Sequence, residues 1–147
     1  MPEDAVLVAR DVRIAVGRLA RQLRRLYGQG QAPGEPAFLE LAILLRVERT
    51  GPSSASVLAT GERVTSQAVS AALAGLRRRG LVRVTTDPDD RRRSLIEISE
   101  TGRQTLERRE RQVGDRLAEV VTADFADAEL ECLEAAVPLL NRIADLL

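Results

Sequence analysis

A basic turn between two short β-like segments constrains the fold of this chain more than any other feature. Residues 81–85 and 95–99 are β-branched and apolar with partial alternation, which is the pattern of half-buried strands. The turn between them, residues 87–94, is longer than hairpin closure requires and contains Pro88 and three consecutive arginines. The pattern therefore predicts a cationic β-hairpin.

The arginines of this turn, Arg91, Arg92 and Arg93, stand beside acids such as Asp90 that can orient a guanidinium group. Guanidinium groups bind phosphate in a planar, bidentate manner, and the narrow minor groove of DNA attracts arginine. We therefore expect the turn to contact an anion, with double-stranded DNA as the first candidate. The alternative is a charged loop that is only solvated, because charge runs are common on protein surfaces.

The segment before the hairpin has the pattern of a helix, a turn and a second helix. A short helix is expected to open at Ser53, and residues 61–64 break it. Thr65 then starts a second helix that reaches Arg79 before Gly80. Thr65 has a side chain that can cap free backbone N–H groups, and Gly80 can supply the left-handed stop. Both ends of the second helix are therefore marked.

The second helix is expected to have one apolar and one small polar face. Val69, Leu73 and Leu76 recur at helical spacing and should face a core. A helix that enters a major groove about 12 Å wide needs small polar side chains on its outer face, with an amide able to pair with a base edge. An ordinary surface helix is the alternative, and the neighbouring turn and arginine hairpin argue against it. The outer face consists of Ser66, Gln67, Ser70, Ala71 and Ala74.

The order and spacing of these motifs resemble the MarR family of bacterial winged helix-turn-helix transcriptional regulators. The resemblance is carried by VTSQAVS at 64–70, LRRRGLV at 76–82, DPDDRR at 87–92 and ISETG at 98–102. It implies that the second helix lies in the major groove and that an arginine of the wing enters the adjacent minor groove. One departure is that family members often have an arginine where this chain has Ala71, so one contact of the family is in doubt here.

The resemblance and the residue pattern together select a set of candidate DNA contacts. Ser66, Gln67 and Ser70 become contacts of the second helix, and Arg91 or Arg92 becomes the side chain that enters the minor groove. The full predicted set is Ser53, Thr65, Ser66, Gln67, Ser70, Arg77, Asp90, Arg91, Arg92 and Arg93.

Helical segments flank this module on both sides. Pro36 suits the first turn of a helix through Arg49, whose apolar run over residues 38–45 predicts burial at the centre of the fold. A charged helix should follow the wing over about residues 102–121. Near the start, an apolar stripe at helical spacing ends in a loop over residues 28–34, and consists of Val8, Val12, Ala15, Leu19, Leu23 and Leu26.

The last predicted helix is capped by Asp127, bent at Pro138, and carries a heptad seam. The two terminal stripes exceed what a winged module of about 50 residues can cover, so we expect two chains to bury them against each other. The alternative is packing within one subunit, and the resemblance favours pairing because terminal helices form the dimer in that family. The seam consists of Leu130, Leu133, Val137, Leu140, Ala144 and Leu147.

The expected fold is mainly α with a small β-hairpin wing (α+β), a winged helix-turn-helix with N- and C-terminal dimerisation helices. Its 147 residues, 44% of them hydrophobic, can bury a core. The expected organisation is an N-terminal dimerisation helix and linker over 1–34, a DNA-binding domain over 35–100, and C-terminal dimerisation helices over 101–147.

The charge distribution supports this division. The net charge is zero, which by itself argues against nucleic acid. However, residues 46–93 hold ten arginines against five acids, whereas residues 94–147 hold six arginines against twelve acids. The basic block coincides with the predicted DNA-binding module.

Enzyme and metal sites have little support in the composition. The absence of histidine excludes histidine triads, histidine general bases and imidazole metal sites, and the single Cys132 excludes an internal disulfide. We therefore expect that the protein is not an enzyme and that it binds no cofactor and no metal. Cys132 reads as a small helix filler, with thiol-based sensing as the alternative. No membrane span or signal peptide is evident, so we expect a cytoplasmic protein.

The expected function is that of a homodimeric, sequence-specific DNA-binding transcriptional regulator acting on a pseudo-palindromic operator. The resemblance implies a repressor and a small aromatic or amphipathic ligand, for which Tyr27, Phe38 and Phe125 could supply aromatic walls. The alternative is a winged-helix protein-interaction module whose DNA binding is lost or vestigial.

Overall fold

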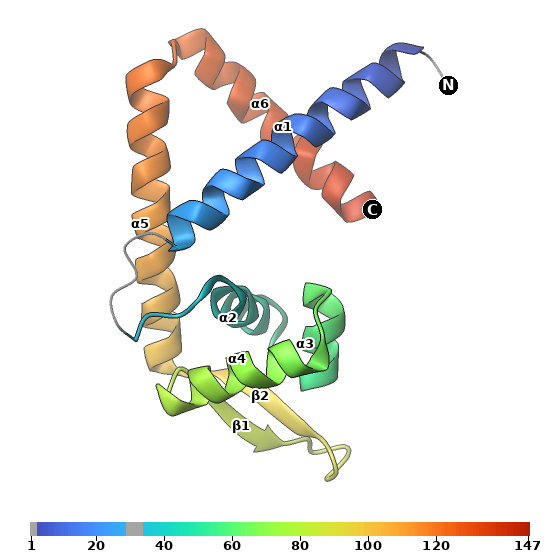
Figure 1. Ribbon diagram of the computed structural model, residues 1–147, viewed down its shortest axis with the longest axis vertical. Coiled ribbons are helices and arrows are strands. Elements are labelled where there is room, and N and C mark those ends of the chain that lie inside the picture. The colour runs from blue at the N-terminus through green and yellow to red at the C-terminus, as the bar shows by residue number, and fades with distance from the viewer. Residues whose placement is uncertain (1–2, 29–33) are drawn as a thin grey trace. The chain divides into compact units, whose positions relative to one another are not determined.

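The computed structural model describes residues 3–28 and 34–147, and within them it is mainly helical with one two-stranded sheet (Figure 1). Most of the loop expected over residues 28–34 lies outside the described residues. The elements are α1 (Glu3–Gly28), α2 (Phe38–Thr50), α3 (Ala55–Glu62), α4 (Ser66–Arg78), β1 (Val82–Thr86), β2 (Ser94–Ile98), α5 (Glu100–Asp124) and α6 (Asp127–Leu146). This order confirms the mainly α fold with a β-hairpin wing.

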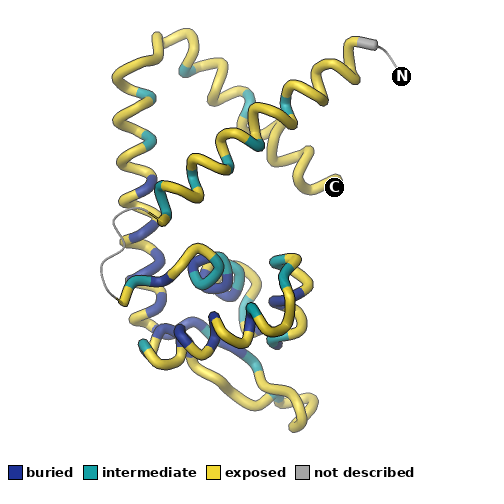
Figure 2. The backbone as a smooth tube through the Cα atoms, in the orientation of Figure 1, coloured by how far each residue is buried: buried dark blue, intermediate teal, exposed yellow. Residues whose placement is uncertain are grey.

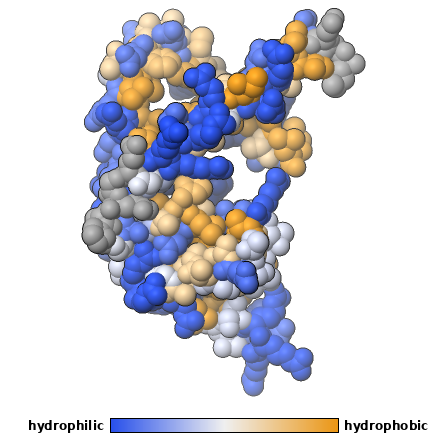
Figure 3. Space-filling view, in the orientation of Figure 1, coloured by the Kyte–Doolittle hydropathy of each residue, from blue (hydrophilic) through white to orange (hydrophobic). Residues whose placement is uncertain are grey.

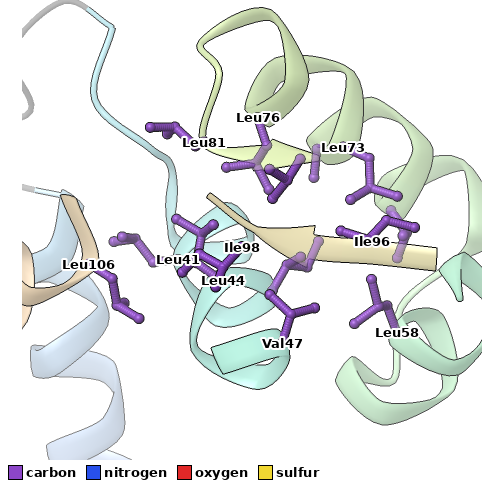
Figure 4. Close-up of a cluster of buried hydrophobic side chains, with 14 of the residues drawn as sticks. Leu41, Leu44, Val47, Leu58, Leu73, Leu76, Leu81, Ile96, Ile98 and Leu106 are labelled. Carbon is purple, nitrogen blue, oxygen red and sulfur yellow. The ribbon is translucent and has the colours of Figure 1, made fainter. Parts of the chain in front are cut away.

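The chain forms two compact units, Met1–Glu110 and Arg111–Leu147. The first unit holds the core, to which α2, α3, α4, the hairpin and the start of α5 contribute (Figures 2 and 4). Each fully buried aliphatic side chain contributes about 1.5–3 kcal/mol to folding. The apolar positions expected on the inner face of the second helix of the motif are all buried, which confirms its orientation. The fully buried aliphatic residues are Ile43, Leu44, Leu58, Val69 and Leu76.

The start and burial of α2 differ from expectation. Ala37 is the N-cap, so Pro36 precedes the helix instead of occupying its first turn. The carboxylate of Glu40 accepts a hydrogen bond from the Ala37 N–H at 2.7 Å, which supplies the cap that an alanine side chain cannot. The apolar run of α2 is not buried throughout, since Phe38 and Leu45 are exposed. A run of eight residues passes around the whole helix, and only one side of it meets the core.

The short helix α3 begins and ends later than expected. Ser54, not Ser53, is its N-cap, and the Ser54 Oγ accepts a hydrogen bond from the Val57 N–H. Gly61 does not break α3, which continues to Glu62. A Cβ at Gly61 would lie 2.6 Å from the Cζ of Arg46, so the glycine leaves room for that guanidinium group. Gly61 therefore lies inside α3, with the Arg46 guanidinium group of α2 in the space next to it.

The predicted cap at Thr65 and the predicted left-handed Gly80 are both confirmed at the ends of α4. The hydroxyl oxygen of Thr65 accepts a hydrogen bond from the Ala68 N–H at 3.2 Å. Gly80 has a φ of 69°, a left-handed conformation in which glycine carries no Cβ penalty. The helix is thereby limited to Ser66–Arg78.

The hairpin forms the predicted wing. Its strands pair antiparallel from Val82 opposite Ile98 to Thr86 opposite Ser94. Val82, Ile96 and Ile98 are buried and attach the base of the wing to the core, whereas most of the connecting residues are exposed. Ser99, which follows β2, also ties the base to α5: its Oγ donates to the Gly80 carbonyl oxygen at 2.6 Å and accepts a hydrogen bond from the Gly102 N–H of α5 at 3.0 Å.

The second unit holds the rest of α5 and all of α6. The N-cap of α6 is Ala126, so Asp127 is the first helical residue and not the cap. The Ala126 N–H donates to the carboxylate of Glu129 at 2.9 Å, as at the start of α2. The helix continues through Pro138, and none of its residues is buried in the single chain. None of the described helices is long and apolar enough to cross a bilayer.

Candidate nucleic-acid interface

The outer face of α4 carries the small polar side chains that are predicted to contact DNA. Ser66, Gln67 and Ser70 are all exposed, and Thr65 is exposed at the N-cap. Because Val69 and Leu76 fix the opposite side of the helix in the core, these polar groups are held on a rigid support. The face can therefore donate and accept hydrogen bonds without any rearrangement of the fold.

The side chain of Arg79, at the end of α4, turns toward α2 and is not fully exposed. Its guanidinium group pairs with the carboxylate of Glu40 in α2 and donates to the carbonyl oxygens of Gly75 at 3.0 Å and Gly34 at 3.1 Å. A Cβ at Gly75 would lie 2.4 Å from the Glu40 Oε1, so this glycine makes room for the ion pair. Of the three arginines at 77 to 79, only Arg77 and Arg78 are exposed.

Arg46 plays a similar structural role for α3. Its guanidinium group donates to the carboxylate of Glu62 at 2.5 Å and to the carbonyl oxygen of Gly61 at 2.9 Å. Together with Arg79, it connects α2 to both helices of the helix-turn-helix. These two arginines of the basic block are therefore already paired with carboxylates of the same chain.

The other arginines of the block lie at the surface. Within residues 34–147, the structure shows no ion pair for any of them, whereas the acid Glu48 is paired with Arg103 at 3.0 Å. Unpaired guanidinium groups keep their charge available for phosphate. The exposed set is Arg49, Arg63, Arg77, Arg78, Arg83, Arg91, Arg92 and Arg93.

The tip of the wing is shaped by its aspartates. The Asp90 Oδ1 accepts a hydrogen bond from the Arg92 backbone N–H at 3.0 Å, and the Arg93 N–H donates to the Asp90 carbonyl oxygen at 2.9 Å. The described residues of the wing contain no ion pair between a carboxylate and a guanidinium group. Asp90 therefore orders the backbone that carries the arginines, and not their side chains. Figure 3 shows the strongly hydrophilic wing at the lower end of the view.

Ser53 is the one predicted contact that the structure does not present at the surface. It is buried, and its backbone pairs with Ile96 through hydrogen bonds of 3.1 and 2.8 Å. Arg83 and Arg63 are exposed and were not predicted. The outward position of Arg83 follows from strand alternation next to Val82, so it could have been found from the sequence. No pattern in the sequence predicts the exposed position of Arg63.

A small cavity lies between α1, α2 and α5 within the first unit. Its volume is about 300 Å³, and its lining includes Leu23, Arg24, Tyr27, Phe38, Leu41, Leu45 and Glu110. The rings of Tyr27 and Phe38 meet edge to face with centroids 5.9 Å apart, and the Arg24 guanidinium lies 5.7 Å from the Phe38 centroid. Phe125, the third aromatic residue considered, belongs to the other unit and does not line this cavity.

The hydroxyl of Tyr27 donates a hydrogen bond to the carboxylate of Glu110 at 2.7 Å. Burial and this hydrogen bond raise the pKa of Tyr27 to about 12. Close by, the buried Arg109 pairs with Glu35 at 3.0 Å and donates to the Tyr27 carbonyl oxygen at 2.6 Å. These contacts tie the end of α1 and the residues before α2 to the start of α5.

Comparison with known proteins identifies the family. The family model described as MarR family matches residues 36–93, from just before α2 to the tip of the wing. An uncharacterized HTH-type transcriptional regulator of Mycobacterium bovis is 30% identical over 146 residues, which cover 99% of this chain and 98% of the relative.

Solved structures agree with this assignment. A crystal structure of a transcriptional regulator protein from Pseudomonas aeruginosa is similar with a TM-score of 0.83 at 28% identity, covering 99% of this chain and 98% of that one. The structure of MarR from E. coli has the same fold, with a TM-score of 0.74 at 19% identity over 86% of this chain and 93% of that one. The chain therefore belongs to the MarR family and is a winged helix-turn-helix, DNA-binding transcriptional regulator.

Proposed function

We propose that this protein acts in the cytoplasm as a homodimeric repressor that binds a pseudo-palindromic operator and is released by a small molecule. The observation that carries the DNA-binding part is the combination of a small polar face on α4 with exposed arginines that have no ion pair within residues 34–147. Short polar side chains can approach base edges, and free guanidinium groups can replace the counterions of phosphate.

The proposed contacts divide by type. Gln67 reads a base edge in the major groove, with Ser66 and Ser70 contributing hydroxyl groups and Thr65 lying at the phosphate backbone. Arg77 binds phosphate at the far end of α4. Ser53 is left out of this proposal because it is buried and paired with Ile96.

The wing supplies the minor-groove contact. Arg91 or Arg92 enters the groove, and Arg93 adds charge beside it. Asp90 supports this indirectly, because it accepts the Arg92 backbone N–H and so holds the shape of the tip. All three arginines are exposed, so their insertion needs no ion pair to be broken first.

The dimer is proposed from apolar side chains that the single chain leaves uncovered. On α1, Val8 is 61% exposed and Leu19 is 53% exposed. On α6, Val137 is 54% exposed and Leu139 is 57% exposed. Each such side chain contributes about 1.5–3 kcal/mol when fully buried, so a second copy that covers both helices would be strongly favoured.

The ligand is proposed to occupy the cavity lined by Tyr27 and Phe38. Its volume of about 300 Å³ lies at the small end of ligand sites. The edge-to-face ring pair and the aliphatic lining suit a small aromatic or amphipathic molecule, and Arg24 can orient a polar group on it. The roles as repressor and ligand sensor otherwise rest on the family resemblance.

Selection from a random-sequence DNA library with the full chain tests the proposal. We expect enrichment of an inverted repeat whose half-site centres lie about one helical turn, roughly 10 bp, apart. Sedimentation should give the mass of two chains for the free protein. Selection of unrepeated sites, or a monomeric mass, would contradict the dimer. Failure to enrich any sequence would favour the protein-interaction alternative. A reporter gene placed behind the selected site should be silenced by the protein, and activation would contradict the repressor role.

A further inference from the structure

The turn between α3 and α4 contains an unusual backbone conformation. Arg63 has φ 54° and ψ 42°, and within the described residues it is the one non-glycine residue with a positive φ. Its N–H donates to the Thr60 carbonyl oxygen at 3.2 Å, and the Val64 N–H donates to the Ala59 carbonyl oxygen at 3.1 Å. These two bonds form a Schellman motif, in which glycine is the usual residue at the left-handed position. Arg63 therefore occupies a position at which its Cβ is unfavourable.

The side chain of Arg63 gains nothing within the fold that would compensate for this. It is exposed, and the structure shows no hydrogen bond or ion pair for its guanidinium group within residues 34–147. The adjacent acid cannot neutralise it, because the Glu62 carboxylate is held by Arg46 at 2.5 Å. The charge of Arg63 is thus available to a binding partner.

The backbone around Arg63 is held firmly. On one side the Schellman motif closes α3, and on the other side Val64 packs against the core. Thr65 follows directly as the cap of α4, and the exposed polar face begins at Ser66. The guanidinium group therefore extends from a rigid turn next to the N-terminal end of α4, which is the end that carries the proposed base contacts.

We propose that Arg63 binds a backbone phosphate of the operator, next to the bases that α4 contacts. The inference rests on the proposed DNA-binding function and adds a contact to it. A guanidinium group can grip phosphate in a bidentate manner, which positions the protein without reading sequence. In this proposal the left-handed turn holds the guanidinium group close to the start of α4.

Substitution of Arg63 by glycine tests the proposal, because it should lower operator affinity without lowering the thermal unfolding temperature. Glycine suits the left-handed conformation, so Arg63→Gly should leave the thermal unfolding temperature unchanged or raise it. Operator affinity of the dimer should nevertheless fall by roughly a hundredfold or more, because one charge-assisted contact of about tenfold is lost in each protomer. The loss should be nearly equal for the selected operator and its single-base variants.

Salt dependence identifies the lost contact as a phosphate. For a dimer that loses one such contact per protomer, the slope of log affinity against log salt should become shallower by about 1.8. Arg63→Lys keeps the charge and should keep most of the slope. Arg111→Ala is the matched control, since it removes an exposed arginine outside the winged module and should change neither affinity nor slope.

Wild-type affinity and slope in Arg63→Gly would overturn the proposal for Arg63 while leaving the DNA-binding function in place. A fall in affinity that is accompanied by a lower unfolding temperature would also overturn it, since that result assigns Arg63 a structural role. Absence of binding by the wild-type protein would instead reject the proposed function itself, and the phosphate contact with it.

Discussion

Replacement of both Arg91 and Arg92 by alanine separates a wing that binds DNA from a wing that is only a charged loop. Both side chains are exposed, and within residues 34–147 neither has an ion pair. Their removal should therefore change the free energy of unfolding by no more than about 0.5 kcal/mol. The hydrogen bonds that shape the tip use backbone groups and Asp90, so they survive the substitution.

The effect on DNA binding can be worked out from the charges removed. If one of the two arginines contacts phosphate in each wing, a dimer loses two contacts, and the slope of log affinity against log salt becomes shallower by about 1.8. If both make contact, the change is about 3.6. Preference for A·T-rich flanks should diminish as well, because a narrow minor groove attracts arginine.

Fluorescence anisotropy with a labelled operator, repeated over a series of salt concentrations, measures both quantities. Thermal unfolding and sedimentation of the same variant check the fold and the dimer. Asp90→Ala should give a weaker loss of affinity, through loosening of the tip and not through loss of charge. Wild-type affinity and slope in the double arginine variant would refute the reasoning, and would reduce the wing to a solvated loop.

Three other predictions concern the face of α4, the cavity and the base of the wing. Gln67→Ala should lower discrimination at one base position of each half-site by about 1–3 kcal/mol, which competition with single-base operator variants will measure; unchanged discrimination would remove this residue from base readout. The single tyrosine, Tyr27, should titrate near pH 12 by phenolate absorbance, and Glu110→Gln should lower its pKa only in part, because burial is the larger cause. The stabilisation of the fold that is linked to this raised pKa is complete below pH 10 and is lost as the pH rises through about 12. A titration midpoint of Tyr27 near its ordinary value of 10 would contradict the structure. Gly102→Ala should reduce the free energy of unfolding by about 1–3 kcal/mol in denaturant titrations, because the new Cβ would lie 2.1 Å from the Leu81 carbonyl oxygen; a neutral substitution would show that α5 can shift freely there.

The sequence by itself determined the order of elements, the ends of α4 and the wing. These features depend on interactions between residues close together in the chain. Thr65 caps its own helix three residues on, and Gly80 ends it through its own φ. The buried face of α4 follows from helical spacing, and the two strands follow from composition on either side of a turn. The exposed residues of α4 are then also determined, because they are the residues of this helix that do not face the core.

Only the tertiary structure decided which charged residues remain available to a partner. Arg77 and Arg79 look alike in the sequence, but Arg79 is drawn inward by Glu40, which is 39 residues away. The sequence predicts that Gly61 breaks the helix, but α3 continues through it, and the Arg46 guanidinium group of α2 lies in the space next to it. The sequence predicts that Ser53 opens a helix and contacts DNA, but Ser53 is buried and paired with Ile96.

The cavity depends on the tertiary structure in the same way. Tyr27 and Glu110 come from the end of α1 and from α5, and no local pattern connects them. Periodicity and capping describe only what a residue does for its own helix or strand. Ion pairs, the space above a glycine and the walls of a cavity arise between segments distant in the chain, and they exist only once the core has brought those segments together.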